Sequence, residues 1–159
     1  MSPHTSELSK NIDQITQFLE EVHATLERAI DGLENPELNW RPSSNSNTIG
    51  NLLKHIMGAE AFWIHHIVGG METQRVRTSE FEVKEFQIII LREEIVHVKE
   101  LTKKVLEKLT DEHLAELRAA RKKQPTVYWC LMNIIKHSAQ HIGQIFYIRK
   151  MYSDLRNQT

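Results

Sequence analysis

Two histidines, His137 and His141, lie four residues apart in a long run of helix-forming residues near the C-terminal end of the sequence. Residues spaced by four positions share one face of an α-helix, with their Cβ atoms about 5–6 Å apart. At that separation two imidazole rings can bind the same metal ion. A hydrated helix face that carries two histidines by chance is the alternative. The spacing therefore raises a metal site as a hypothesis.

Other polar side chains continue the same helix face, namely Cys130, Asn133 and Gln144, whereas most remaining positions of the segment are apolar. A line of polar groups inside a helical bundle is unfavourable unless each group has a partner, so the line suggests a site. Asn133 and Gln144 could orient ligands or substrate. Cys130 is two turns from His137, about 10 Å along the axis, and we expect it to be a core thiol rather than a nucleophile.

Length and composition favour one domain, residues 1–159, with a sizeable apolar core. The formal net charge is −1, from 20 basic and 21 acidic residues, so no basic excess favours nucleic acid or an anionic membrane as a partner. No apolar run approaches the roughly 20 residues that span a bilayer, and no signal peptide is visible. Together with the single cysteine, these features predict a cytoplasmic protein.

Apolar residues recur at helical spacing over four long segments, and only 6 glycines and 4 prolines occur in the sequence. In the segment between the first two helices, Pro36 and Pro42 are expected to prevent helix formation, and Trp40 is expected to dock on the bundle as an anchor or as a pocket wall. The elements predict an all-α four-helix bundle with one extra short helix before the last long helix. The expected helices cover residues 5–32, 48–69, 79–109, 110–120 (the short one) and 126–152.

The second long helix supplies a third candidate metal ligand, His55. It lies mid-helix beside the apolar stripe, and the small residues Gly58 and Ala59 are expected to leave room next to its ring. Three histidines from two packed helices would leave open positions on a metal for water or substrate, as a catalytic site requires. We therefore predict that His55, His137 and His141 bind one divalent ion, Zn, Ni or Fe, because imidazole suits these metals.

Several other polar residues are expected to have structural roles. His66 is three turns from His55, about 16 Å away, too far to share its ion. Glu60 interrupts the apolar stripe before Trp63 and is expected to pair with the 33–47 loop, with proton transfer as the alternative. His23 is expected at the border of the bundle, or in support of the site. The cationic run 121–123 is expected to be a solvated loop, with an anion site at the pocket rim as the alternative.

Three motifs of the sequence resemble the DinB/YfiT-like superfamily of small four-helix metalloproteins. They are Leu38-Asn-Trp-Arg-Pro, Thr48-Ile-Gly-Asn-Leu-Leu-Lys-His55-Ile-Met-Gly-Ala-Glu-Ala-Phe-Trp63 and His137-Ser-Ala-Gln-His141-Ile-Gly-Gln144-Ile. The resemblance spans nearly the whole chain. It implies that His55, His137 and His141 form a three-histidine metal site.

Members of this superfamily with assigned activities look like thiol-dependent transferases or isomerases that use bacillithiol, mycothiol or glutathione, and others are described as metal-dependent hydrolases. The resemblance thus implies an enzyme with a small-molecule substrate, and we expect it to transfer a bacillithiol-type thiol to an electrophile. A metal-dependent hydrolase and a non-catalytic stress-response binding or scaffold module are the alternatives. A homodimer is also expected, from the resemblance and from apolar residues beyond one stripe, such as Phe86, Ile89 and Ile90.

Overall fold

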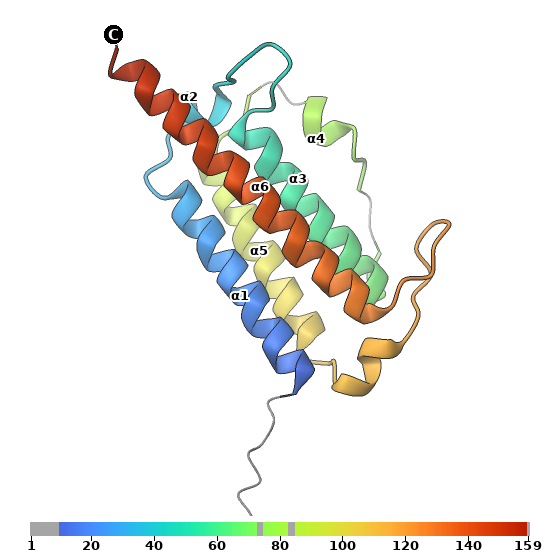
Figure 1. Cartoon of the computed structure of the whole chain (residues 1–159). Coiled ribbons are helices and arrows are strands. Elements are labelled where there is room, and N and C mark those ends of the chain that lie inside the picture. The colour runs from blue at the N-terminus through green and yellow to red at the C-terminus, as the bar shows by residue number, and fades with distance from the viewer. Residues whose placement is uncertain (1–9, 73–74, 83–84, 159) are drawn as a thin grey trace, which may run out of the picture.

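The computed structural model of the chain is a bundle of long helices, and it describes residues 10–72, 75–82 and 85–158. In Figure 1, α6 (red) runs across the face formed by α1 (blue) and α3 (green), and α5 (yellow) lies behind it. No strand occurs among the described residues. The predicted all-α four-helix bundle is confirmed. Its long segments are α1 (Asn11–Ile30), α3 (Ile49–Glu60) with its continuation η1 (Ala61–Val68), α5 (Ile88–Leu106) and α6 (Val127–Arg156).

The two helices that carry the predicted metal ligands begin at capping residues. The Thr48 hydroxyl accepts a hydrogen bond from the backbone N–H of Asn51, and the Asn51 side chain accepts one from the N–H of Thr48. At the start of α6, the Thr126 hydroxyl accepts from the N–H of Trp129 at 3.1 Å. These bonds satisfy donors that a helix N-terminus leaves free. Both helices therefore start where the sequence predicts.

The helix that continues α3 changes its hydrogen-bonding pattern. Over Ala61–Val68 the bonds are π-helical, so that each N–H reaches one residue further back than in an α-helix. The wider turn shifts the side chains, and Ile64 and His65 are buried where α-helical spacing placed Trp63 inward. Trp63 is partly exposed and packs edge-on against Trp129, with ring centroids 5.2 Å apart.

Three segments differ from the expectation. The 33–47 segment contains a short helix, α2 (Asn35–Asn39), since Pro36 lies in its first turn, where the missing N–H costs nothing. Residues Ser79–Glu82 form a separate helical turn, α4, so the long helix begins at Ile88 rather than at Ser79. The expected short helix is a 3₁₀ turn, η2 (Asp111–Ala115), followed by a loop with two isolated bridges. Residues 5–9, where the first helix was expected to start, lie outside the described residues.

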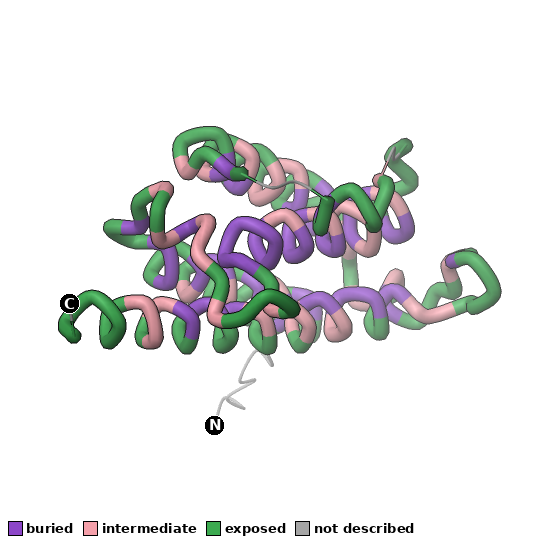
Figure 2. Tube along the Cα trace, turned by 90° about the horizontal axis from the view of Figure 1, so that it is seen from above, coloured by how far each residue is buried: buried purple, intermediate pink, exposed green. Residues whose placement is uncertain are grey.

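Two apolar clusters fill the bundle, and a layer of polar side chains lies between them. Figure 2 shows the buried residues along the inner faces of the helices. On α1, His23 lies between Leu19 of one cluster and Leu26 of the other. Thr102 has the same position on α5, as do His137 and Ser138 on α6. The middle of the bundle is therefore the polar level at which chemistry can take place.

Two aromatic residues, Trp40 and Phe86, contribute to the apolar cluster that contains Leu26. Trp40 docks on the bundle as predicted, with its ring 5.6 Å from that of Tyr152. Phe86 is buried and fills the space left by Gly50, so it is not part of an exposed apolar surface. Ile89 and Ile90 are exposed and remain candidates for a dimer contact. None of the described helices is long and apolar enough to cross a membrane.

Candidate metal centre

The structure brings the three predicted ligands together between α3 and α6. One ring nitrogen from each of His55, His137 and His141 lies within 4.8 Å of the others. The shortest distance, 3.0 Å, joins Nε2 of His55 to Nε2 of His137. Because a Zn–N bond is about 2.0–2.1 Å long, this distance suits two nitrogens on one ion. Among the described residues, no carboxylate or thiolate joins the group.

A buried carboxylate fixes the orientation of His55. Nδ1 of His55 donates a hydrogen bond to Oε2 of Glu80 at 2.9 Å, which leaves the Nε2 lone pair directed at the other histidines. Glu80 is held in turn by Arg75, whose Nε and Nη2 donate to its two oxygens at 2.5 and 3.1 Å. Burial alone would raise the pKa of Glu80, but the hydrogen bonds from Arg75 and His55 lower it by a larger amount. The pKa is therefore below its ordinary value, and the carboxyl is ionised at neutral pH.

An amide plays the corresponding part for His141. Nδ1 of His141 donates to Oε1 of Gln144 at 2.7 Å, so its Nε2 atom carries the free lone pair. Gln144 thus holds a ligand, one of the roles considered for it from the sequence. Asn133 is half-buried and makes no hydrogen bond with the three histidines among the residues described.

His137 is half-buried, and its Nδ1 atom is buried without a hydrogen-bond partner among the described residues. Burial, followed by the positive charges of His141 and His55, lowers its pKa to about 4, so it is neutral near pH 7. Burial also lowers the pKa of His55. Two neutral imidazoles whose Nε2 atoms lie 3.0 Å apart need a proton or a cation between them. The donor set therefore fits a divalent metal, whose ligands must be neutral imidazoles.

The positive charge near the three histidines comes from Arg75 and Arg77, and not from the cationic run 121–123. Arg75 and Arg77 both contribute to the lowered pKa of His137. Arg77 is exposed, and none of the ion pairs between described residues engages it. By contrast, Arg121 lies over the Phe62 ring at 5.1 Å, and Lys122 and Lys123 are exposed. The structure therefore places the 121–123 run in a loop rather than at the three histidines.

The space beside Gly58 is filled, contrary to expectation. A Cβ atom at this position would overlap Oε1 of Glu80 and would meet Nε of Arg75 at 3.0 Å. The small residue therefore admits the carboxylate that orients His55, rather than an open metal position. Ala59 packs in an apolar cluster. The Phe81 ring covers another side of His55, with centroids 5.2 Å apart.

Glu60 and His23 form a second buried group, separate from the three histidines. Nε2 of His23 lies 2.9 and 3.1 Å from the two carboxylate oxygens of Glu60, and the Thr102 hydroxyl donates to Glu60 at 2.5 Å. The expectation that Glu60 pairs with the 33–47 loop is wrong, as is the border position for His23, which is only 8% exposed. Burial alone would raise the pKa of Glu60, but the contacts with His23 and Thr102 lower it by a larger amount, so the pKa lies below its ordinary value.

Sequence reasoning missed Glu80, Arg75 and His65. Glu80 and Arg75 lie in the connection before α5, and nothing in their spacing indicates that they fold back onto α3. His65 is buried by the π-helical turn, where Nε2 lies 2.9 Å from the Thr102 hydroxyl. Cys130 is fully buried, and burial raises the pKa of its thiol to about 11, which suits a core residue.

A long-helix bundle with three histidines converging from two helices defines a class of small helical proteins with a candidate divalent-metal site. Residues 18–145 match the family model of the DinB superfamily. The chain belongs to this superfamily. None of the curated proteins compared with the chain matches it.

Solved structures share the fold at low sequence identity. A DinB-like protein from Bacillus cereus superposes with a TM-score of 0.76 at 16% identity, over 89% of this chain and 92% of that one. YfiT from Bacillus subtilis, described as a probable metal-dependent hydrolase with an unusual four-helix bundle topology, gives 0.72 at 19% identity, over 96% and 94%. A second DinB-like protein from Bacillus subtilis gives 0.68 at 18%, over 88% and 92%. These likenesses support the fold.

Proposed function

We propose that the chain is a metal-dependent enzyme that transfers a low-molecular-weight thiol, of the bacillithiol type, to an electrophile. His55, His137 and His141 would hold one Zn, Ni or Fe ion. Such an ion acts as a Lewis acid and lowers the pKa of a thiol or water that it binds. The observation that carries the proposal is the all-imidazole donor set, because three neutral ligands leave the double positive charge in place and favour an anionic ligand.

The surrounding residues support an anionic, polar substrate. Glu80 is neutralised by Arg75, and Arg77 adds a positive charge that can attract a carboxylate of the thiol or the electrophile. A hollow of about 700 Å³ lies between the 42–47 loop and α6, and Gln144, which holds His141, lines it. Asn45, Ser46 and Gln140 supply further hydrogen-bonding groups there. This volume is within the range of small-molecule sites.

Hydrolysis is the second candidate, favoured by the description of YfiT as a probable metal-dependent hydrolase and by the same donor set. Thiol transfer and hydrolysis need the same three metal ligands, so the ligands do not distinguish the two reactions. The two reactions differ in whether a thiol is consumed. A homodimer with a cytoplasmic location remains part of the proposal, and light scattering of the purified protein tests the assembly.

The first test is elemental analysis of untagged protein beside a His137→Ala/His141→Ala variant, with His97→Ala as the control because His97 is exposed. We expect about one Zn, Ni or Fe per chain in the wild type and in the control, and none in the double variant. Equal metal content in all three proteins, or none in any after reconstitution, would contradict the site.

The second test measures turnover of a thiol with 1-chloro-2,4-dinitrobenzene, and of 4-nitrophenyl acetate without thiol, in wild type and His141→Ala. Thiol transfer that the variant loses supports the transferase, and ester hydrolysis that it loses supports the hydrolase. Equal rates in both proteins in both assays would favour a non-catalytic stress-response module.

A further inference from the structure

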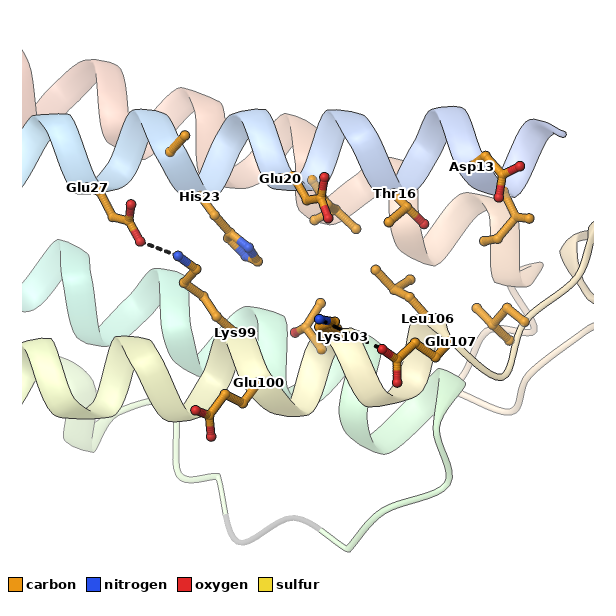
Figure 3. Close-up of a pocket in the computed structure, with 15 residues that line it drawn as sticks. Asp13, Thr16, Glu20, His23, Glu27, Lys99, Glu100, Lys103, Leu106 and Glu107 are labelled. Carbon is orange, nitrogen blue, oxygen red and sulfur yellow. Dashed lines mark hydrogen bonds and ion pairs between the residues drawn. The ribbon is translucent and has the colours of Figure 1, made fainter. Parts of the chain in front are cut away.

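Transfer of a thiol requires a second substrate, the electrophile, beside the three histidines. The groove of about 600 Å³ between α1 and α5, shown in Figure 3, shares no residue with them. The hollow that Gln144 lines carries the amides and the hydroxyl proposed for a polar substrate. A further surface is the junction where η1, which continues the helix of His55, packs against α6, the helix of His137 and His141. This junction borders the metal centre on the side of η1.

Aromatic side chains from both helices meet at the junction. The Trp129 ring packs edge-on against Trp63, and Trp63 packs edge-on against Phe62, with ring centroids 5.2 Å apart in both pairs. Trp129 is 42% exposed, and Trp63 and Phe62 are partly exposed, so part of each ring is open to a ligand. Trp129 precedes His137 by eight residues, about 12 Å along the helix axis. The rings are therefore within reach of a small molecule whose reacting atom lies at the three histidines.

The backbone of η1 turns one of these rings outward. In an α-helical register Trp63 belongs to the inward stripe, whereas in the π-helical turn Ile64 and His65 are buried and Trp63 faces Trp129. π-Helical turns are rare and frequently occur at functional sites. The loss of a buried tryptophan position is unfavourable for packing, so the turn favours a role for the Trp63 ring at the surface.

An amide without a protein partner lies between the aromatic rings and the metal ligands. Asn133 is four residues from Trp129 and four from His137, so the three side chains follow one another along α6. Asn133 is half-buried, and no hydrogen bond between described residues engages its side chain. Partly buried amides normally have a partner, so this one is available to a polar group of a ligand.

We propose that the electrophile is an aromatic compound, whose ring binds at the junction against Trp63 and Trp129. The Asn133 amide hydrogen-bonds to a polar substituent of that ring. Phe81, which is 39% exposed with its ring centroid 5.2 Å from that of His55, adds aromatic surface directly beside the metal ligands. This inference rests on the proposed function, but the aromatic residues themselves are not metal ligands, so their binding of a ring can be measured separately.

The test is equilibrium dialysis of the full-length protein, as purified and after chelation, with 2-naphthol and its saturated analogue 2-decalol. The two compounds share a carbon skeleton and a hydroxyl group. We expect saturable binding of one 2-naphthol per chain, about threefold to tenfold tighter than that of 2-decalol, because only the aromatic ring gains contacts with the tryptophan rings. Chelation should leave this affinity unchanged.

Three outcomes of the dialysis would overturn the proposal. Equal affinities for the two compounds would exclude the aromatic class, and no saturable binding of 2-naphthol would exclude the site. Loss of binding after chelation would place 2-naphthol on the metal instead of at the junction. None of these outcomes depends on turnover, so failure of the aromatic site is distinguishable from failure of the proposed function.

Two variants locate the ring. Trp129→Ala, at an exposed position, should weaken 2-naphthol binding about tenfold. Tyr128→Ala is the matched control, because Tyr128 is also exposed and points about 100° away around α6. It should leave the affinity within about twofold. Equal affinities of the two variants would overturn the proposal. Asn133→Ala should weaken binding about threefold to tenfold, and an unchanged affinity would overturn the role of the amide.

Steady-state kinetics supply a second readout. Trp129→Ala should raise the KM for 1-chloro-2,4-dinitrobenzene about tenfold, leave the KM for the non-aromatic electrophile iodoacetamide within about twofold, and keep the metal content of the wild type. The same change in KM for both electrophiles would overturn the selection of aromatic compounds by Trp129. If the wild type turns over neither compound, the proposed function fails, and the dialysis results still decide whether the junction binds an aromatic ring.

Discussion

Nε2 of His55 on α3 lies 3.0 Å from Nε2 of His137 on α6. Each of the two rings is neutral at pH 7, because burial lowers both pKa values. A proton on one of the two nitrogens can bridge them as a hydrogen bond, and a metal ion in its place would bind both lone pairs. With His141 as the third donor, the three rings are placed as the proposed metal site requires.

Removal of the metal is expected to lower the melting temperature of the wild type. At a metal concentration a hundred times Kd, binding adds about 2.7 kcal/mol to the free energy of unfolding, or roughly 5–10 °C for a chain of this size. Differential scanning calorimetry with and without a chelator measures the shift. His55→Ala should show almost none, and a similar shift in both proteins would place the metal elsewhere.

Gly58→Ala is expected to weaken metal binding without touching a ligand. The added methyl group would displace the Glu80 carboxylate from His55, so that the ring loses its fixed orientation. Loss of such a partner typically costs 10–100-fold in metal affinity. Competition with a fluorescent chelator measures the Kd, and Gly143→Ala is the control, because a Cβ atom there meets nothing within 4 Å. Equal affinities of the two variants would refute the role of Glu80.

The metal-free protein is expected to lose stability as the pH falls from about 6.5 to about 4. An unfolded histidine binds a proton near pH 6.5, whereas folded His137 does so only near pH 4, so the unfolded state holds more protons in this window. The loss at about pH 5 should be about 1 kcal/mol, after allowance for solvent around this partly exposed ring. Urea titrations of wild type and His137→Gln measure it, and identical pH dependence would contradict the lowered pKa.

Thr102→Val should destabilise the fold by about 1–3 kcal/mol, although valine has almost the same shape. The substitution removes the donor to Glu60 and the partner of His65 Nε2, and both groups are buried. Thr78→Val, at an exposed threonine, serves as the control in urea unfolding. Similar free energies of unfolding for the two variants would show that the buried bonds contribute little.

Periodicity and spacing predict what is local along the chain. The four long helices, the starts of two of them near Thr48 and Thr126, and the pairing of His137 with His141 all depend on residues within a few positions of one another. His55 could be added because it lies mid-helix on a face that packs against another helix. These features follow from the α-helical repeat, so the fold and the candidate ligands were accessible from the sequence.

The contacts that the sequence did not reveal join distant segments. Glu80 reaches His55 only because the connection before α5 folds back over Gly58. The pair of Glu60 and His23 depends on how α1 docks against the helix that carries Glu60. The π-helical turn in η1 also breaks the 3.6-residue repeat, so a periodic pattern assigns Trp63 to the interior and passes over His65.

The docking of α3 against α6 has a kinetic consequence. His55 and His137 are 82 residues apart, so one ion bound by both closes a long loop of the chain. This link forms only after the helices have docked, and it must break before they separate. Metal should therefore leave the refolding rate nearly unchanged while it slows unfolding, so that the ion lengthens the lifetime of the folded chain more than it speeds its formation.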